Sequence, residues 1–171
     1  MGIYMLQIKR IADRAREQEI QALESEYFTW VNEQLHAEFQ IVLDIDRLIA
    51  GDITNLERYL PPTGGLFLAE KESALAGMIF LTQLRPAVGQ IRRMYVRDGF
   101  RRLGIARTLF EAAIREARKI GYAQLLLESP RSWVGAHALY HELGFEAVET
   151  YPESEVPEPL RKYWVFMRLA L

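Results

Sequence analysis

Residues 90–121, QIRRMYVRDGFRRLGIARTLFEAAIREARKIG, decide the fold that we expect for this chain. From Gln90 to Val96, β-branched and aromatic residues alternate with other side chains, which predicts a β-strand. The dipeptide Asp98-Gly99 is a turn signal. From Leu103 onward the apolar residues recur every three or four positions until Gly121, which predicts an amphipathic helix with a glycine cap. The stretch therefore predicts a strand, a tight arginine-rich turn and a long helix.

The turn between that strand and that helix carries the candidate chemistry. Its segment Arg101–Ala106, RRLGIA, places Gly104 and Ala106 at a helix N-terminus, where backbone N–H groups lack acceptors and the helix dipole is positive. Small residues there would let a phosphate oxygen approach the main chain. The turn alone is equally compatible with a solvated surface turn. Further positive charge comes from Arg97, Arg101, Arg102 and Arg107.

Composition places limits on the function. A chain of 171 residues with 50% hydrophobic and 26% charged residues is typical of one globular domain, here residues 1–171. A net charge of −2 gives no global attraction to nucleic acid or to an anionic membrane. The absence of cysteine excludes disulfides and a cysteine nucleophile, and three histidines without HxH or HExxH spacing argue against a metal centre. Because we see neither a membrane-length apolar run nor a leader pattern, we expect a cytoplasmic protein.

The rest of the chain adds further strands and helices around this stretch. Helices are expected from an Asp13 cap to about Phe39 and over Asp46–Tyr59 and Val134–Leu143, and Tyr151–Lys162 is expected to be a mobile loop. Strands are expected at Met5–Arg10, Leu66–Glu70, Leu75–Leu84, Ala123–Glu128, Phe145–Val148 and Tyr163–Leu169.

Strand, helix and strand over Gln90–Glu128 form one right-handed βαβ unit, so those two strands should be parallel. The flanking hairpins should be antiparallel. We therefore expect an α/β fold with a central, twisted, mixed sheet of six to seven strands and helices on both faces. A ligand would lie at the carboxyl ends of the parallel strands, over the helix N-terminus.

Three sequence features then occur in a recognisable order. RRLGIA lies between a strand that ends in YV and a long helix, the next strand ends in LLLES, and a short helix carries AHALYHELGF. Over residues 90–148 this combination resembles the GNAT superfamily of acetyl-coenzyme A-dependent N-acetyltransferases. The family's phosphate-binding pattern, (Arg/Gln)-x-x-Gly-x-(Gly/Ala), matches Arg101–Ala106. The resemblance implies the GNAT-like acyl-CoA N-acyltransferase fold and acetyl-CoA as cosubstrate, without a metal.

The resemblance also implies a set of coenzyme-binding residues. The amides around Arg102–Arg107 would bind the pyrophosphate, and the main chain of Met94–Val96 would bind the pantetheine arm like an added strand. Many relatives carry Asn where this chain has Trp133, so Trp133 is expected to pack on the coenzyme instead. The full set is Met94, Tyr95, Val96, Arg101, Arg102, Leu103, Gly104, Ile105, Ala106, Arg107, Trp133, His137 and Tyr140.

Tyr140 is the candidate general acid. On a helix, Trp133, His137 and Tyr140 share one face. Transfer from a thioester requires that the departing sulfur be protonated or hydrogen-bonded, and a phenol can do this. Tyr140 also occupies the family's tyrosine position. The competing interpretation is a helix residue anchored by its ring.

The amine side of the reaction is less determined by the sequence. Glu128, at the end of the central strand, is the first candidate for the base, and Glu70 is a weaker one; either could be a carboxylate at the rim of the site. Tyr27 and Trp30 could line the acceptor cleft or pack at its edge, together with the loops 52–65 and 151–162. The absence of cysteine favours direct attack in a ternary complex.

The sequence thus predicts an N-acetyltransferase that acts on a primary amine of a small molecule or peptide. Neither nucleic acid nor membrane is an expected partner, and a homodimer is left open. The alternative is a non-catalytic acyl-CoA-binding or regulatory module on the same fold, because a fold does not determine a function.

Overall fold

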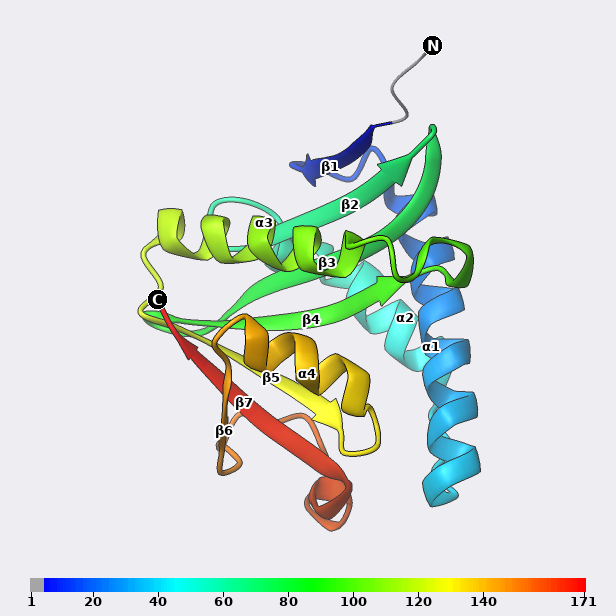
Figure 1. The fold of residues 1–171 in the computed structure, drawn as a ribbon, viewed down its shortest axis with the longest axis vertical. Coiled ribbons are helices and arrows are strands. Elements are labelled where there is room, and N and C mark those ends of the chain that lie inside the picture. The colour runs from blue at the N-terminus through cyan, green and yellow to red at the C-terminus, as the bar shows by residue number, and fades with distance from the viewer. Residues whose placement is uncertain (1–4) are drawn as a thin grey trace.

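The computed structural model describes residues 5–171, and within them the chain forms a mixed seven-stranded sheet in the order β1-β2-β3-β4-β5-β7-β6. Figure 1 shows α3 and α4 on one face of this sheet and α1 and α2 on the other. The strands are β1 Leu6–Ile11, β2 Gly65–Lys71, β3 Ala74–Arg85, β4 Val88–Val96, β5 Gln124–Pro130, β6 Glu146–Val148 and β7 Trp164–Ala170. The helices are α1 Glu17–Phe39, α2 Ile45–Thr54, α3 Ile105–Ile120 and α4 Val134–Glu142, with short 3₁₀ turns at Leu56–Tyr59, Asp98–Phe100 and Glu158–Tyr163.

The sheet separates two apolar clusters, one on each face. On the α3 and α4 face, Leu109 and Phe110 are fully buried among the side chains of the central strands. On the α1 face, Ile20 and Leu23 are fully buried against Leu66 and its neighbours. Burial of this size, at about 1.5–3 kcal/mol for each large apolar side chain, fixes which face of each helix meets the sheet.

The two parallel strands of the expected βαβ unit pair only at their beginnings. β4 and β5 are parallel, as predicted, with Val88, Gly89 and Gln90 opposite residues 124–126. Beyond this point β5 stays paired with β7, whereas Ile91–Val96 of β4 has no partner on the β5 side among the described residues. The strands therefore diverge toward their carboxyl ends and leave unpaired main chain along β4.

An irregularity in β4 lies within this divergent part. The register between β3 and β4 shifts between Met78 and Phe80, opposite Arg93. Arg93 has a φ of 51°, in the left-handed region that non-glycine residues seldom adopt. The extra residue is a β-bulge, which bends β4 locally within its divergent part.

Several boundaries differ from those expected. The long helix begins at Ile105 rather than Leu103, which is 51% exposed in the turn. Asp13 does not cap α1, because this helix begins only at Glu17. The carboxylate of Asp13 instead accepts a hydrogen bond from the N–H of Ala15 at 2.8 Å. The stretch 46–59 is divided at Asn55 into α2 and a 3₁₀ turn. The loop 151–162 buries Tyr151 and Val156, so part of it packs on the sheet.

Candidate active site

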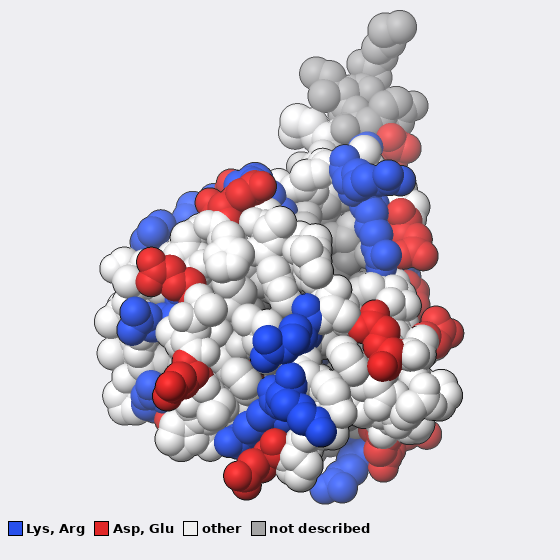
Figure 2. Space-filling model, turned by 60° about the horizontal axis from the view of Figure 1, so that its bottom comes forward, with Lys and Arg blue, Asp and Glu red and all other residues white. Residues whose placement is uncertain are grey.

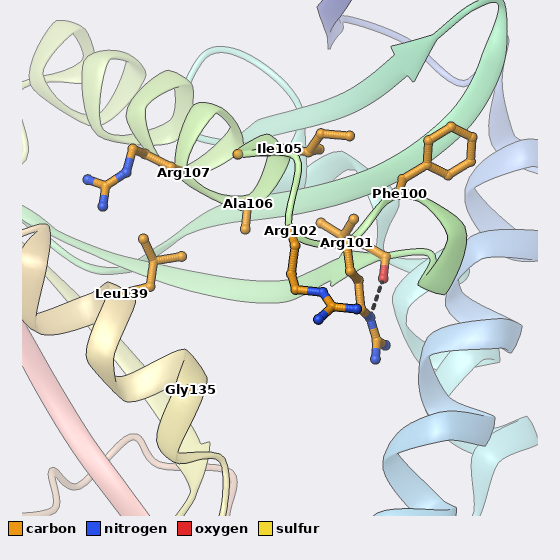
Figure 3. A pocket seen from close by; sticks show the side chains of 10 residues that line it. Phe100, Arg101, Arg102, Ile105, Ala106, Arg107, Gly135 and Leu139 are labelled. Atoms are coloured by element: carbon orange, nitrogen blue, oxygen red, sulfur yellow. Dashed lines mark hydrogen bonds between the residues drawn. The ribbon is translucent and has the colours of Figure 1, made fainter.

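The arginine-rich turn lines a cavity of about 350 Å³ between the start of α3 and α4. Figure 3 shows Arg101 and Arg102 extending from the turn in the same direction, with Arg107 further along α3 and Gly135 and Leu139 across from them on α4. Of the residues predicted to bind the coenzyme, this cavity is lined by Val96, Arg101, Arg102, Gly104, Ile105, Ala106 and Arg107, together with Phe100, Gly135 and Leu139, which the sequence did not indicate.

The backbone of the turn explains the glycine at its centre. Gly104 precedes α3 with a φ of 77°, and a Cβ there would meet nothing within 4 Å. The left-handed backbone conformation, and not a lack of space for a side chain, therefore favours glycine at this position. The first backward hydrogen bond at this end runs from the Thr108 N–H to the Gly104 carbonyl at 3.1 Å. The preceding amides at the helix start are left to bind an anion at the positive end of the dipole.

The arginines around this helix end differ in their partners. Arg101 pairs with Asp98 at 2.9 Å and donates from Nε to the Val96 carbonyl at 3.1 Å, which joins the turn to the end of β4. Arg107 pairs with Glu142 of α4. Within residues 5–171, Arg102 makes no ion pair, so its charge is available to a ligand.

A second, larger cavity of about 660 Å³ lies on the α1 and α2 side of the sheet. Its walls come from α1, α2, β4, β5 and the loop before β7. Tyr27, Glu128 and Trp133 line it, as do Asp52 and the loop residues 155–157. Trp133, predicted to pack on the coenzyme, lines this second cavity and does not line the cavity at the arginine-rich turn.

Trp30 connects the two cavities through aromatic contacts. Its ring centroid lies 4.8 Å from that of Trp133, and the Arg101 guanidinium lies 4.9 Å from the Trp30 ring centroid. Such a contact between a cation and an aromatic face is attractive. Tyr27 lines the second cavity and meets Tyr95 of β4 edge-on, with ring centroids 5.9 Å apart. The two aromatic residues predicted on α1 therefore lie beside the site, at its edge.

Tyr140 is the buried residue of α4. Its side chain is buried, its ring is 5.3 Å from Phe110, and burial raises the pKa of its phenol. The phenol is therefore protonated at neutral pH and can donate a hydrogen bond. His137, on the same face, lies with Nε2 3.1 Å from Ser129 Oγ, and its pKa is lowered, chiefly by burial. Ser129, the last residue of LLLES, was not predicted to be a site residue.

Glu128 is the acidic residue that β5 directs into the second cavity. Its Oε1 is buried without a hydrogen-bond partner among the described residues, and burial raises its pKa. The hydroxyls of Ser154 and Tyr151 lower the pKa of Glu128, but burial has the larger effect. Such a carboxylate can accept a proton more readily than an exposed one.

Glu70, the weaker candidate for the base, is not brought to this site. It pairs with Lys9 and, at 2.6 Å, with Arg16 beside the start of α1, and it lines neither cavity. Hydrogen bonds from Lys9 and Arg16 lower its pKa. The ion pairs lie between the β1–β2 edge and α1, because β2 places Glu70 opposite Gln7 of β1. Glu70 is therefore held in ion pairs apart from both cavities.

A buried charged cluster next to the second cavity was missed entirely. Asp52 accepts hydrogen bonds from the Tyr59 hydroxyl at 2.7 Å and from Arg93 Nε at 2.5 Å. Although burial opposes its ionisation, the charge of Arg93 holds the pKa of Asp52 below its usual range. Glu24 is fully buried beside it, and burial, reinforced by Asp52, raises the pKa of Glu24 to about 9. The raised pKa of Glu24 and the lowered pKa of Asp52 favour a protonated Glu24 beside an Asp52 carboxylate that is paired with Arg93.

Comparison with known proteins identifies the class to which this site belongs. The family model described as "Acetyltransferase (GNAT) family" matches residues 17–145. An uncharacterised N-acetyltransferase of Schizosaccharomyces pombe is 28% identical over 118 residues, which is 68% of this chain and 69% of that protein. A GNAT-family acetyltransferase from Staphylococcus aureus superposes with a TM-score of 0.74 at 22% identity, covering 96% of this chain and 99% of that one.

A further solved structure, an acetyltransferase of Salmonella typhimurium with its cofactor acetyl-CoA, has a TM-score of 0.67 at 20% identity and covers 98% of this chain and 94% of that one. These neighbours establish the fold. The family match, over more than half of the chain, establishes the class: the chain belongs to the acetyltransferase (GNAT) family. It is therefore an acetyl-CoA-dependent acyltransferase.

Charged side chains of both signs lie on the face shown in Figure 2, where basic side chains form small groups bordered by acidic ones. Among residues 5–171, no helix has both the length and the apolar character needed to cross a bilayer.

Proposed function

We propose that this enzyme transfers the acetyl group of acetyl-CoA to a primary amine of a small molecule or peptide, by direct attack while both substrates are bound. The observation that carries the proposal is the divergence of β4 and β5, with one cavity on each face of the sheet beside the gap. Two reactants that enter from opposite faces can meet there without a covalent enzyme intermediate.

The first cavity fits the phosphate end of acetyl-CoA. Free amides at the start of α3 and the unpaired guanidinium of Arg102 suit a pyrophosphate, whose charge a helix N-terminus stabilises. On the side away from β3, the main chain of Met94–Val96 has no partner strand among the described residues, and its free groups would bind the two amides of the pantetheine arm. Val96 retains a carbonyl lone pair for this purpose after accepting from Arg101.

Two residues would move the protons. The buried phenol of Tyr140 is protonated at neutral pH and would donate its proton to the departing thiolate. Glu128, whose pKa burial raises, would accept the amine proton directly or through water. Glu128 lines the second cavity, whereas Tyr140 belongs to the apolar core on the α3 and α4 face of the sheet.

Release of free thiol from acetyl-CoA in the presence of a panel of amines tests this function. We expect amine-dependent release in the unaltered enzyme and its loss in Tyr140→Phe. Tyr122→Phe is the matched control, because Tyr122 lies before β5, where its hydroxyl donates to the Thr63 carbonyl away from both cavities. Tight binding of acetyl-CoA with no release for any amine would instead indicate a non-catalytic acyl-CoA-binding module.

A further inference from the structure

Arg92 is a buried cation in the wall of the second cavity. Its side chain is 8% exposed, and it comes from the divergent part of β4. Both of its terminal nitrogens donate to the carboxylate of Glu155, Nη1 to Oε1 at 2.6 Å and Nη2 to Oε2. A buried guanidinium needs such a planar, two-point partner, because an unpaired charge in this position is costly.

Glu155, in contrast, is a partner that can leave. Its side chain is 52% exposed, and it lies on the irregular segment between β6 and the last 3₁₀ turn. Arg58 lies 4.0 Å from the same carboxylate and also lines the cavity. One exposed carboxylate is therefore held between a buried guanidinium fork and a second arginine. If another carboxylate replaced it, the buried charge would stay paired and Glu155 would return to water at little cost.

The surroundings of this subsite indicate what else the ligand carries. Glu128 lines the same cavity, close enough that the charge of Arg92 acts on its pKa. The remaining wall is largely apolar and includes Phe28, Val31, Leu35, Ile41 and Leu160. The cavity thus combines a proton acceptor, a carboxylate subsite and an apolar wall. Its volume of about 660 Å³ lies in the range of small-molecule sites.

We propose that the acceptor is a small amino acid-like molecule with a free carboxylate near its amine and an apolar side chain, and that its carboxylate displaces Glu155 from Arg92 and Arg58. This inference rests on the proposed acetyl transfer. In that step the amine nitrogen forms a bond to the acetyl carbon and the C–S bond breaks. One amine proton passes to Glu128, and the departing sulfur takes a proton from Tyr140. The acceptor's carboxylate and side chain take no part in the chemistry and serve to orient the amine.

A pair of acceptors that differ only in the carboxylate tests the subsite. L-leucine and 3-methylbutylamine have the same amine and apolar group, and thiol release from acetyl-CoA is measured for both at equal concentrations of the free base. We expect kcat/KM to favour L-leucine by about 10- to 100-fold, the range of a charge-assisted, two-point hydrogen bond. Equal kcat/KM values would overturn the subsite while leaving transfer to amines intact.

Two variants assign the preference to the named residues. Arg92→Lys keeps the buried charge beside Glu155 but loses the planar fork, so the preference for L-leucine should fall about tenfold or more. Glu155→Gln removes the competing carboxylate, so the preference should increase. Arg118→Gln and Glu158→Gln, which alter exposed residues outside the cavity, are the matched controls and should leave the preference unchanged. An unchanged preference in Arg92→Lys, or a reduced one in Glu155→Gln, would refute the exchange.

A binding measurement separates this inference from the proposed function. Calorimetric titration of L-leucine into the enzyme saturated with coenzyme A reads the subsite without chemistry. Binding that Arg92→Lys weakens, without thiol release from acetyl-CoA for any amine, would reject the transfer and retain the subsite. Thiol release with 3-methylbutylamine but no measurable L-leucine binding would retain the transfer and reject the subsite.

Discussion

The two cavities of this enzyme are assembled in opposite ways. The first cavity, the proposed coenzyme cavity, is formed mainly by one continuous segment, residues 96–107, with Gly135 and Leu139 opposite. The second cavity, the proposed acceptor cavity, is formed by side chains from α1, α2, β4, β5 and the loop before β7. A continuous segment can bind a shared chemical group with its own backbone, whereas a cavity built from many segments can vary in each wall.

The two cavities also differ in how their charges are balanced. Around the coenzyme cavity the arginines are exposed or half-buried, and Arg102 makes no ion pair among the described residues. In the acceptor cavity the cations Arg92 and Arg93 are buried and already paired with Glu155 and Asp52. A ligand adds its charge at Arg102, whereas at Arg92 or Arg93 it must exchange with a carboxylate that the protein supplies.

The largest effect that we expect tests the junction of the two cavities. Tyr140→Phe should lower kcat by about 10²–10⁴, with little change in the affinity for acetyl-CoA, because only the leaving thiolate needs the proton. Steady-state kinetics and calorimetry on the same preparation check this. A variant that keeps most of its kcat would assign the hydroxyl to structure and protonation of the thiolate to water.

A substitution at the helix terminus tests the coenzyme side alone. Gly104→Asp should weaken acetyl-CoA binding at least tenfold, because a carboxylate would repel the pyrophosphate at that end of α3. Gly104→Asn has the same shape without the charge and tolerates the left-handed backbone at φ 77° comparatively well, so it is the matched control. Equal affinities for the two variants, in calorimetric titration, would remove the phosphate-site assignment.

The pH dependence of turnover tests the base on the acceptor side. Glu128 accepts a proton only when ionised, and burial raises its pKa, so kcat/KM should rise with pH through that pKa and again as the amine loses its proton. Glu128→Gln should lack the lower of these two ionisations and should lose about tenfold in rate at neutral pH, since water can replace the carboxylate. A pH profile identical to that of the parent enzyme would exclude Glu128 as the base.

The smallest effect concerns the buried charges behind the acceptor cavity. Because the pKa of Glu24 is raised to about 9, folded protein retains its proton where unfolded protein has lost it, so this contribution to stability decreases as pH rises from the unfolded value of 4.5 toward 9. Glu24→Gln cannot titrate. Its free energy of unfolding relative to the parent should therefore increase by about 1 kcal/mol or more between pH 5 and pH 9. Urea denaturation of both proteins at several pH values measures this difference in the free energy of unfolding. A difference that does not change with pH would contradict the raised pKa of Glu24.

The fold could be predicted because its signals are local. Helical spacing after the turn, the apolar run Leu125–Leu127 and the small residues of RRLGIA each reflect the physics of neighbouring residues. The errors there were also local: the exposed Leu103 continues the helical spacing although the left-handed Gly104 delays the helix start. Sequence spacing describes side chains, but it does not determine where the backbone becomes helical.

The acceptor side could not be predicted, because its partners meet only through the fold. Glu24, Asp52 and Arg93 lie on three different elements, and each alone resembles an ordinary surface charge in the sequence. The pairing of Arg92 with Glu155, 63 residues apart, depends on how the loop before β7 returns over β4. The sequence ranked Glu128 above Glu70 as a candidate base, but only the fold shows that Glu70 lies at the β1–β2 side of the sheet and Glu128 in the wall of the second cavity.

The most direct test of the account is whether both cavities must be filled at once. Initial rates of thiol release, measured while acetyl-CoA and an accepted amine are varied together, distinguish the two cases. Direct attack in a ternary complex predicts double-reciprocal lines that intersect, with slopes that depend on the second substrate. Parallel lines, accompanied by a burst of thiol before any amine is added, would show an acetylated enzyme and would contradict the account.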